Sequence, residues 1–155
     1  MSEERHAFVE EFGVMFEQMG STRMLGRVWA ALMVADPPEM TAEELADYLQ
    51  ASRGSISQAT RQLISLGVVQ RVSKPGVRRD YYRVPTNAWP RAYFTKMKAF
   101  DDIFALFQRG RDAMADASPE AQTPIKEALL FYEFWQKEVE HLLDRWHEFK
   151  ESQRD

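Results

Sequence analysis

Three cationic side chains lie within six residues of one another, around a Pro-Gly pair. They are Lys74, Arg78 and Arg79, in the stretch SKPGVRRDYY that covers residues 73–82. Ammonium and guanidinium groups form charge-assisted hydrogen bonds with phosphate oxygens, and the planar guanidinium forms two at once. Pro75 followed by Gly76 suits the central positions of a type II turn. The stretch therefore predicts a turn over residues 73–80 whose tip carries cations able to bind a polyanion.

The charge of the chain is unevenly distributed. The formal net charge is -4 at pH 7, yet residues 51–91 contain eight Lys or Arg and one acid, Asp80. This segment carries +7, and the remainder of the chain -11. Acidic flanks repel a polyanion everywhere except at the basic middle, which favours a single docking orientation. A solvated basic loop without a ligand is the alternative interpretation.

A second group of side chains suited to nucleic acid precedes the turn, in an expected helix over residues 52–66. Its small or hydrogen-bonding members are Ser52, Arg53, Gly54, Ser55, Ser57, Gln58 and Arg61. Small residues let a helix backbone approach a duplex, while Arg can bind guanine and Gln adenine through two hydrogen bonds. The free N–H groups at a helix N-terminus also attract phosphate, so Ser52, Arg53 and Ser55 are alternatively phosphate contacts. The match between side chain and base stays open.

Local signals predict the elements that position these residues. Thr41 and Glu44 form a capping-box pattern at the start of a short helix. Ser52 suits the N-cap of the next helix, which ends near Gly67. The inward-facing residues of this second helix are Ile56, Ala59, Leu63 and Leu66. The β-rich runs VVQRV and YYRV flank the turn and predict a two-stranded hairpin. A helix-turn-helix followed by a hairpin is a winged helix.

Amphipathic helices are expected on both sides of this unit. Residues 3–19 place Phe and Met at three- and four-residue spacings, and a largely apolar helix begins at Ser21 or Thr22 and ends before Asp36. The C-terminal region repeats the pattern in two helices that separate near Ser118. Their apolar positions are Tyr93, Met97, Phe100, Phe104, Phe107, Met114, Phe131, Trp135, Val139, Leu142, Trp146 and Phe149. These seams are longer than a winged helix needs for its own core, so we expect self-association.

The sequence thus predicts a mainly α fold with a small two-stranded β-wing. The expected parts are an N-terminal dimerisation helix in residues 1–20, a winged helix-turn-helix in residues 21–87 and a C-terminal helical dimerisation region in residues 88–155. One winged helix reads few bases. We therefore expect a homodimer that binds an inverted repeat in double-stranded DNA, with half-sites about 10 bp apart or a multiple of that.

Several short motifs together resemble a known family. They are Gly26-Arg27, Asp36-Pro37-Pro38, Glu44-Leu45-Ala46, Ser52-Arg53-Gly54-Ser55-Ile56-Ser57 and Pro75-Gly76-Val77-Arg78-Arg79-Asp80-Tyr81-Tyr82. In this order, over roughly residues 8–87, the chain resembles the GbsR branch of the MarR-type transcriptional regulators. The resemblance implies a dimeric winged helix-turn-helix repressor with its fourth helix in the major groove, its wing near the minor groove and its terminal helices at the dimer interface.

The resemblance also implies a small-molecule effector, because MarR-type regulators usually respond to compounds lodged between the DNA-binding lobe and the dimer helices. Aromatic side chains could stack on an aromatic ligand or enclose a quaternary ammonium, which the choline sensing associated with the GbsR branch would suit. The candidates are Trp89, Tyr93, Phe131, Tyr132, Phe134 and Trp135. Ordinary core or dimer packing is the alternative role for these residues.

Other classes of function find less support in the sequence. There is no cysteine, Gly-rich phosphate loop or G-x-S-x-G motif, so we expect neither an enzyme nor a cofactor. His141, Asp144 and His147, three residues apart, leave a metal-dependent enzyme as an alternative, although we expect no metal site. A helical architectural protein that binds DNA without choosing a sequence is another alternative. The N-terminus lacks the apolar run of a signal peptide and no segment has the about 18–20 apolar residues of a membrane span, so we expect a cytoplasmic protein without a membrane partner.

Overall fold

The computed structural model describes residues 2–153 of the chain. The side chains of residues 91, 94–99, 140 and 143 lie outside this description, and the predicted seam position Met97 is among them. The chain divides into two compact units, an N-terminal unit of residues 1–95 and a C-terminal unit of residues 96–155. Each unit is treated by itself below.

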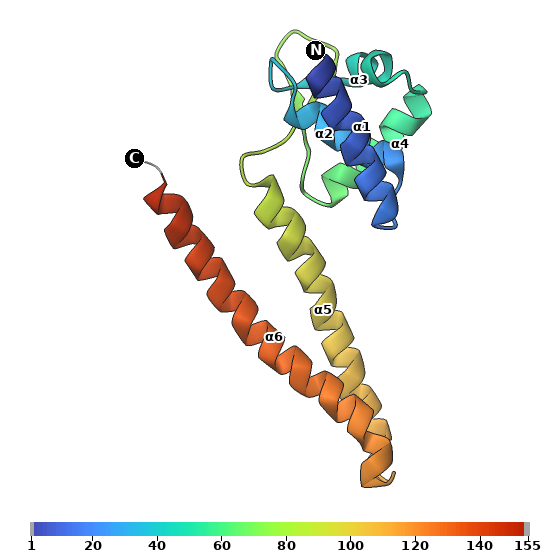
Figure 1. The fold of residues 1–155 in the computed structure, drawn as a ribbon, viewed down its shortest axis with the longest axis vertical. Helices are drawn as coiled ribbons and strands as arrows, with labels where there is room; N and C mark the ends of the chain where they lie inside the picture. Colours follow the sequence, from blue (N-terminus) through green and yellow to red (C-terminus); the bar gives the residue numbers. More distant parts are fainter. Residues whose placement is uncertain (1, 154–155) are drawn as a thin grey trace. The chain divides into compact units, whose positions relative to one another are not determined.

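The N-terminal unit contains the expected helix-turn-helix and hairpin (Figure 1). Its elements in chain order are α1 (Glu3–Gln18), α2 (Arg23–Met33), β1 (Met40–Thr41), α3 (Ala42–Leu49), α4 (Arg53–Ser65), β2 (Gln70–Ser73), β3 (Asp80–Arg83) and the first turns of α5 (Ala88–Ala113). The fold is mainly helical with a small antiparallel sheet, as the sequence predicts.

The helices begin where side chains can satisfy free backbone N–H groups. Thr22, rather than the equally eligible Ser21, caps α2 by accepting a hydrogen bond from the Leu25 N–H at 3.2 Å. Ser52 caps α4 in the same way, as the sequence predicts. The capping box of α3 is complete, because Thr41 Oγ1 accepts from the Glu44 N–H at 3.2 Å and Glu44 Oε2 accepts from the Thr41 N–H at 2.6 Å.

The core of the N-terminal unit surrounds α2, which is buried on almost every side. Its close contact with α1 depends on Gly26, where an added Cβ would lie 2.8 Å from the Phe16 Cβ and 2.9 Å from the Phe12 carbonyl oxygen. The Arg27 guanidinium donates to Glu10 on α1 at 2.7 Å and to the Leu49 carbonyl oxygen at 3.0 Å. The Gly26-Arg27 pair therefore ties α1 and the end of α3 to α2.

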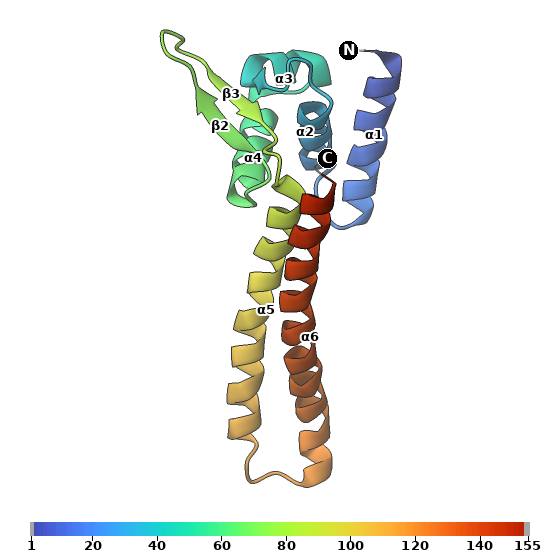
Figure 2. The same cartoon turned by 90° about the vertical axis from the view of Figure 1, so that its left-hand side faces the viewer.

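The sheet has three strands in the order β1-β3-β2, with both pairs antiparallel. Figure 2 shows β2 and β3 as a hairpin. The predicted two-stranded wing is present, and the sequence prediction lacked β1, which pairs Thr41 with Tyr81. A strand of two residues is too short to show the alternation that marks a strand in sequence. At the wing tip Gly76 has φ 77°, and the Val77 N–H donates to the Lys74 carbonyl oxygen at 3.2 Å, as a type II turn requires.

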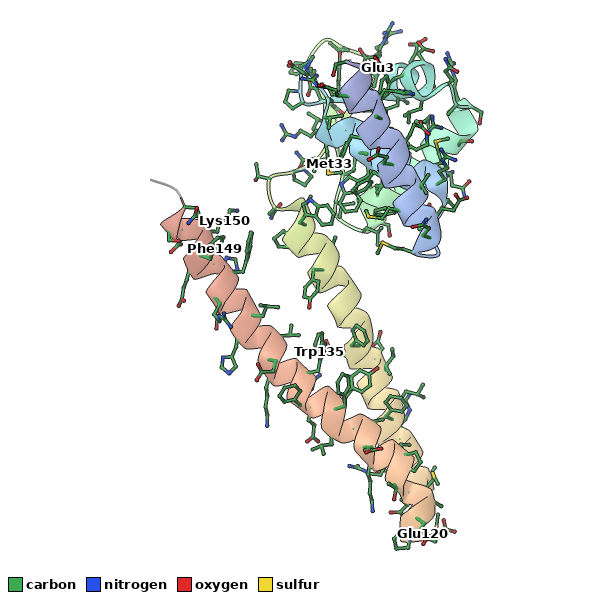
Figure 3. All side chains as sticks on the ribbon, viewed as in Figure 1. Glu3, Met33, Glu120, Trp135, Phe149 and Lys150 are labelled. Atoms are coloured by element: carbon green, nitrogen blue, oxygen red, sulfur yellow. The ribbon has the colours of Figure 1, made fainter. Side chains whose placement is uncertain are left out.

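The C-terminal unit consists of the remainder of α5 and the long α6 (Pro119–Ser152), which run antiparallel and are joined by a short turn (Figure 2). Ser118 caps α6, and Tyr132 of α6 contacts Phe100 and Phe107 of α5 with ring centroids 5.9 and 5.5 Å apart. Many large apolar side chains of this unit are nevertheless exposed, and α6 carries most of them along its length, as Phe149 illustrates (Figure 3). They are Ile103, Leu106, Leu130, Phe131, Phe134, Leu142, Trp146 and Phe149.

Candidate nucleic-acid interface

Helix α4 presents a polar face to solvent and an apolar face to the core. Ile56, Ala59 and Leu63 are buried, as expected from their spacing, while Leu66 is half-buried. The predicted contact residues Ser52, Arg53, Gly54, Ser57, Gln58 and Arg61 are exposed, and Ser55 is half-buried. Thr60 is a polar residue on the buried side, where its hydroxyl donates to the Ile56 carbonyl oxygen at 2.8 Å. Helix α4 therefore has a continuous polar face free to meet a ligand.

The first turn of α4 is organised by two hydroxyl groups. Ser52 Oγ accepts from the Ser55 N–H at 3.1 Å, and the two side-chain hydroxyls lie 2.8 Å apart. Among the described residues, a Cβ built on Gly54 would contact only Ser52 Oγ, at 3.8 Å, so none of them requires glycine at this position. A glycine that the fold does not need suits a surface where another backbone or a duplex comes close.

The three cations of the wing tip are exposed, but they differ in their partners. Lys74 forms an ion pair with Glu39 and lies 4.2 Å from the centroid of the Tyr81 ring. These contacts turn the Lys74 side chain toward Glu39 and the sheet, and the hydrogen bond with Glu39 raises the pKa of Lys74. Arg78, in contrast, makes no ion pair with any residue that the structure describes.

The strands behind the tip hold the hairpin together through Asp80. Its carboxylate accepts from the Ser73 hydroxyl at 3.0 Å and forms an ion pair with Arg71 at 3.0 Å, so both partners lie on β2. Tyr82 packs against the core, whereas Tyr81 lies beside Lys74. The two tyrosines thus have the different environments expected of neighbours on one strand.

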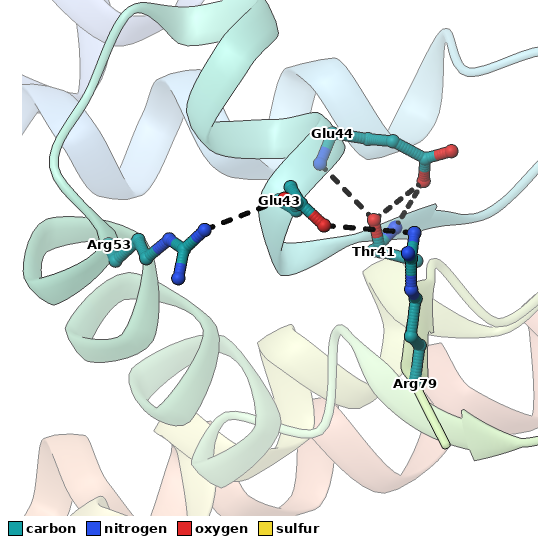
Figure 4. Close-up of polar contacts among 5 residues, drawn as sticks. All are labelled: Thr41, Glu43, Glu44, Arg53 and Arg79. Carbon is teal, nitrogen blue, oxygen red and sulfur yellow. Dashed lines mark hydrogen bonds and ion pairs between the residues drawn. The ribbon is translucent and has the colours of Figure 1, made fainter. Parts of the chain in front are cut away.

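Glu43, in the first turn of α3, connects α4 with the wing (Figure 4). Its Oε1 lies 3.5 Å from Nη2 of Arg53, and its Oε2 lies 3.7 Å from Nη1 of Arg79. Because one carboxylate reaches both cations, the N-terminus of α4 and the wing lie on the same side of α3. Sequence reasoning missed this residue, since an acid at the start of a helix is explained by the helix dipole alone.

Its neighbour Glu44 serves a different purpose. Besides the backbone contact, Glu44 Oε2 accepts from the Thr41 hydroxyl at 2.9 Å. The hydrogen bonds from the Thr41 backbone and side chain lower the pKa of Glu44, so this carboxylate is ionised at neutral pH. Thr41 also pairs with Tyr81 of β3, and the capping box therefore joins α3 to the sheet that carries the wing.

The aromatic residues predicted to bind an effector fall into two groups, one in each unit. In the N-terminal unit, Trp89 lies on Trp29 with ring centroids 4.8 Å apart and is 56% exposed, and Tyr93 is exposed as well. In the C-terminal unit, Phe131 contacts Tyr132 and Trp135 with ring centroids 5.9 and 6.3 Å apart. Whether the two groups share one pocket stays a prediction.

Among the described residues there is neither a group of side chains that could hold a metal ion nor a helix that could span a bilayer. None of its groups of three His, Asp or Glu side chains, His141, Asp144 and His147 included, has an arrangement that could hold a metal ion. Within residues 2–153, none of the helices combines the length and apolarity needed to cross a bilayer.

The chain is similar to known proteins along most of its length. Residues 87–151 match a family model described as MmpR5-like MarR family transcriptional regulator, in a region where the sequence offered no short motif. The HTH-type transcriptional regulator MmpR5 of Mycobacterium tuberculosis is 34% identical over 139 residues, which cover 90% of this chain and 84% of that protein. The HTH-type transcriptional repressor GbsR of Bacillus subtilis is 27% identical over 93 residues, 56% of this chain and 51% of GbsR.

A solved structure supports the same assignment. A crystal structure of a transcriptional regulator superposes with a TM-score of 0.84 at 32% identity, covering 94% of this chain and 99% of that one. The MarR-type resemblance of the sequence is confirmed, and the GbsR match agrees with the branch that the motifs indicated. The chain belongs to the MarR family of HTH-type transcriptional regulators.

Proposed function

We propose that the protein represses transcription by binding an inverted-repeat operator as a homodimer. As a member of a family of transcriptional regulators, it acts by sequence-specific DNA binding and is not an enzyme. The observation that carries the proposal is the meeting of Arg53 from α4 and Arg79 from the wing at the carboxylate of Glu43. A polar helix and a cationic hairpin on one side of the N-terminal unit can contact the base edges and the phosphates of one duplex.

In the proposed complex, α4 enters the major groove with its first turns. Gln58 and Arg61, exposed beyond the capped first turn, suit base edges, where a bidentate contact contributes about 1–3 kcal/mol of discrimination. Ser52, Ser55 and the N–H groups around Gly54 suit a phosphate. Arg78 and Arg79 on the wing would reach flanking phosphates or the narrow groove, adding affinity with little sequence information. Lys74 would join them after leaving Glu39.

The homodimer is proposed to form through the helices of the C-terminal unit. Exposed side chains such as Phe131, Phe134 and Leu130, with 59, 58 and 68% of their surface accessible, gain free energy when a second copy covers them. A two-fold axis would place two copies of α4 about one helical turn of DNA apart, near 10 bp or a multiple of it. The operator would accordingly be an inverted repeat.

A small-molecule effector that releases the operator is the second part of the proposal. The half-exposed ring of Trp89 can stack on a planar ligand or a quaternary ammonium. The Nε1 of Trp135 is buried without a hydrogen-bond partner among the described residues, and a ligand could accept from it. Titration with benzoate and with tetramethylammonium, followed by tryptophan fluorescence, tests both chemistries. Because a repressor acts on the genome, we also expect the protein in the cytoplasm.

The decisive experiment measures sequence preference. The protein selects duplexes from a random-sequence library, and fluorescence anisotropy compares the selected duplex with one of the same composition in scrambled order. We expect an inverted repeat, bound at least about a thousandfold more tightly than the scrambled duplex at physiological salt. A preference below about tenfold would instead favour the architectural alternative, which binds DNA without choosing a sequence. Analytical ultracentrifugation of the free protein tests the dimer separately.

A further inference from the structure

We infer that Glu43 is a positioning residue that raises the discrimination of this regulator, because its contacts with Arg53 and Arg79 are lost on DNA of arbitrary sequence and largely kept on the operator. The inference rests on the proposed function. Glu43 is not expected to touch a base, and the inference gives a role to an acid on the side of the unit that is proposed to face DNA. This restraint of the two arginines would lower the affinity for DNA of arbitrary sequence more than the affinity for the operator.

The geometry suits a restraint that DNA can displace. The distances of 3.5 and 3.7 Å from Glu43 to the two guanidinium groups are ion-pair distances, longer than the 2.7–2.9 Å typical of strong charged hydrogen bonds. The side chains of Arg53, Arg79 and Glu43 are 83, 69 and 52% exposed. Exposed pairs of this kind are weak, so phosphate oxygens can compete with the carboxylate for either arginine.

Stability alone does not explain Glu43. The neighbouring Glu44 already completes the capping box, and Thr41 satisfies the free N–H at the third position of α3. Glu43 adds the favourable interaction of an acid with the helix N-terminus, but Glu44 provides that interaction as well. What distinguishes Glu43 is its contact with cations from two separate elements, α4 and the wing (Figure 4).

The effect on discrimination follows from what each complex gains. On arbitrary DNA, the two arginines can only exchange one carboxylate for phosphates, while Glu43 itself is brought toward the negative duplex. On the operator, Arg53 can reach a base edge with some of its five N–H groups while another still faces Glu43, so more of the ion pair survives in that complex. Glu43 therefore weakens the nonspecific complex more than the specific one.

The test compares Glu43→Gln with Asp47→Asn. Both variants remove one negative charge from α3, but Asp47 is exposed and makes no ion pair with any residue in the described part of the chain. Binding to the selected duplex and to its scrambled counterpart is measured by anisotropy over a series of salt concentrations. Thermal unfolding of both variants shows whether α3 is intact.

For Glu43→Gln we expect the Kd for scrambled DNA to fall by about threefold to tenfold, the range that two weak ion pairs allow. The Kd for the selected duplex should change less, so the specificity ratio shrinks, and the salt dependence on scrambled DNA should become steeper. In an Arg79→Ala background the effect should be smaller. Asp47→Asn should leave the specificity ratio unchanged.

Three results would overturn the inference: an unchanged Kd for scrambled DNA, an equal gain on both duplexes, or the same effect from Asp47→Asn. The proposed function fails in a different way, when the wild-type protein selects no preferred duplex at all. The scrambled duplex still reports on the restraint in that case, because Arg53 and Arg79 would be released toward any phosphate.

Discussion

The wing provides the sharpest test of how this protein holds DNA. Replacing Arg78 and Arg79 by Ala removes two exposed cations from the tip, where nothing in the core depends on them. Each phosphate contact contributes about 0.9 to the slope of log K against log salt, so about 1.8 is the largest loss of slope that the double variant can show. Between about 0.2 M and about 0.05 M salt, the advantage of the wild-type protein over the variant should therefore grow by up to about twelvefold.

The two arginines should not contribute equally. Arg78 is unpaired among the described residues, whereas Arg79 must first leave Glu43. The single variant Arg78→Ala should thus lose most of the about 0.9 in salt slope that one phosphate contact contributes, and Arg79→Ala should lose less. Because phosphate contacts do not report sequence, both should weaken the selected and scrambled duplexes by similar factors.

The measurement is a fluorescence-anisotropy titration at several salt concentrations, with Arg109→Ala as the control. Arg109 is exposed on α5 in the C-terminal unit and forms no ion pair with another described residue, so its removal changes the net charge equally without touching the wing. A salt slope that is the same for the wild-type protein and the double variant would refute the role of the wing. So would a loss confined to the selected duplex, because that pattern belongs to base reading.

Further predictions concern stability and close approach. Gly26→Ala should lower the free energy of unfolding by about 1–3 kcal/mol in a urea titration, because its Cβ would lie 2.8 Å from the Phe16 Cβ. Gly54→Ala should instead raise stability slightly, since on this helix its Cβ would make only an ordinary contact with Ser52 Oγ at 3.8 Å. The same substitution should weaken DNA binding, because the backbone of α4 is proposed to approach the duplex here. Thr41→Ala should remove about 1 kcal/mol of stability with the capping box, measurable by thermal unfolding. The Thr41 hydrogen bonds hold the pKa of Glu44 below its ordinary value of 4.5. The stability that they provide is therefore complete above pH 4.5 and is lost as the pH falls through the lower pKa of the folded state. Glu44→Gln should make the free energy of unfolding less dependent on pH in this acid range.

Local signals in the sequence were sufficient for most of the N-terminal unit. The Thr41 capping box, the Ser52 cap and the Pro75-Gly76 turn each involve residues within four positions of one another, so their hydrogen bonds are fixed by local backbone geometry. The winged helix follows once those elements are placed. The β1 strand, by contrast, exists only because residue 41 meets residue 81, a pairing without a local signal.

The same distinction applies to the candidate site. The polar face of α4 could be predicted because its alternation with buried residues has the period of a helix. Glu43 could not, since its partners Arg53 and Arg79 lie 10 and 36 positions away and belong to different elements. In the C-terminal unit, periodicity predicted two helices correctly, but one chain cannot show what covers their exposed apolar faces.

The ion pairs also change what the charge of the basic segment means. Residues 51–91 carry +7 after Asp80 is subtracted, yet three of their cations contact acids outside the segment: Lys74 contacts Glu39, while Arg53 and Arg79 contact Glu43. A cation that stays paired with its acid when it contacts a phosphate displaces few counterions from the DNA. The salt slope per protomer should therefore stay well below the magnitude of about 6 that seven free charges would give. If it reached that value, the acids would have to move away on binding, and the restraint assigned to Glu43 would be released completely on any duplex.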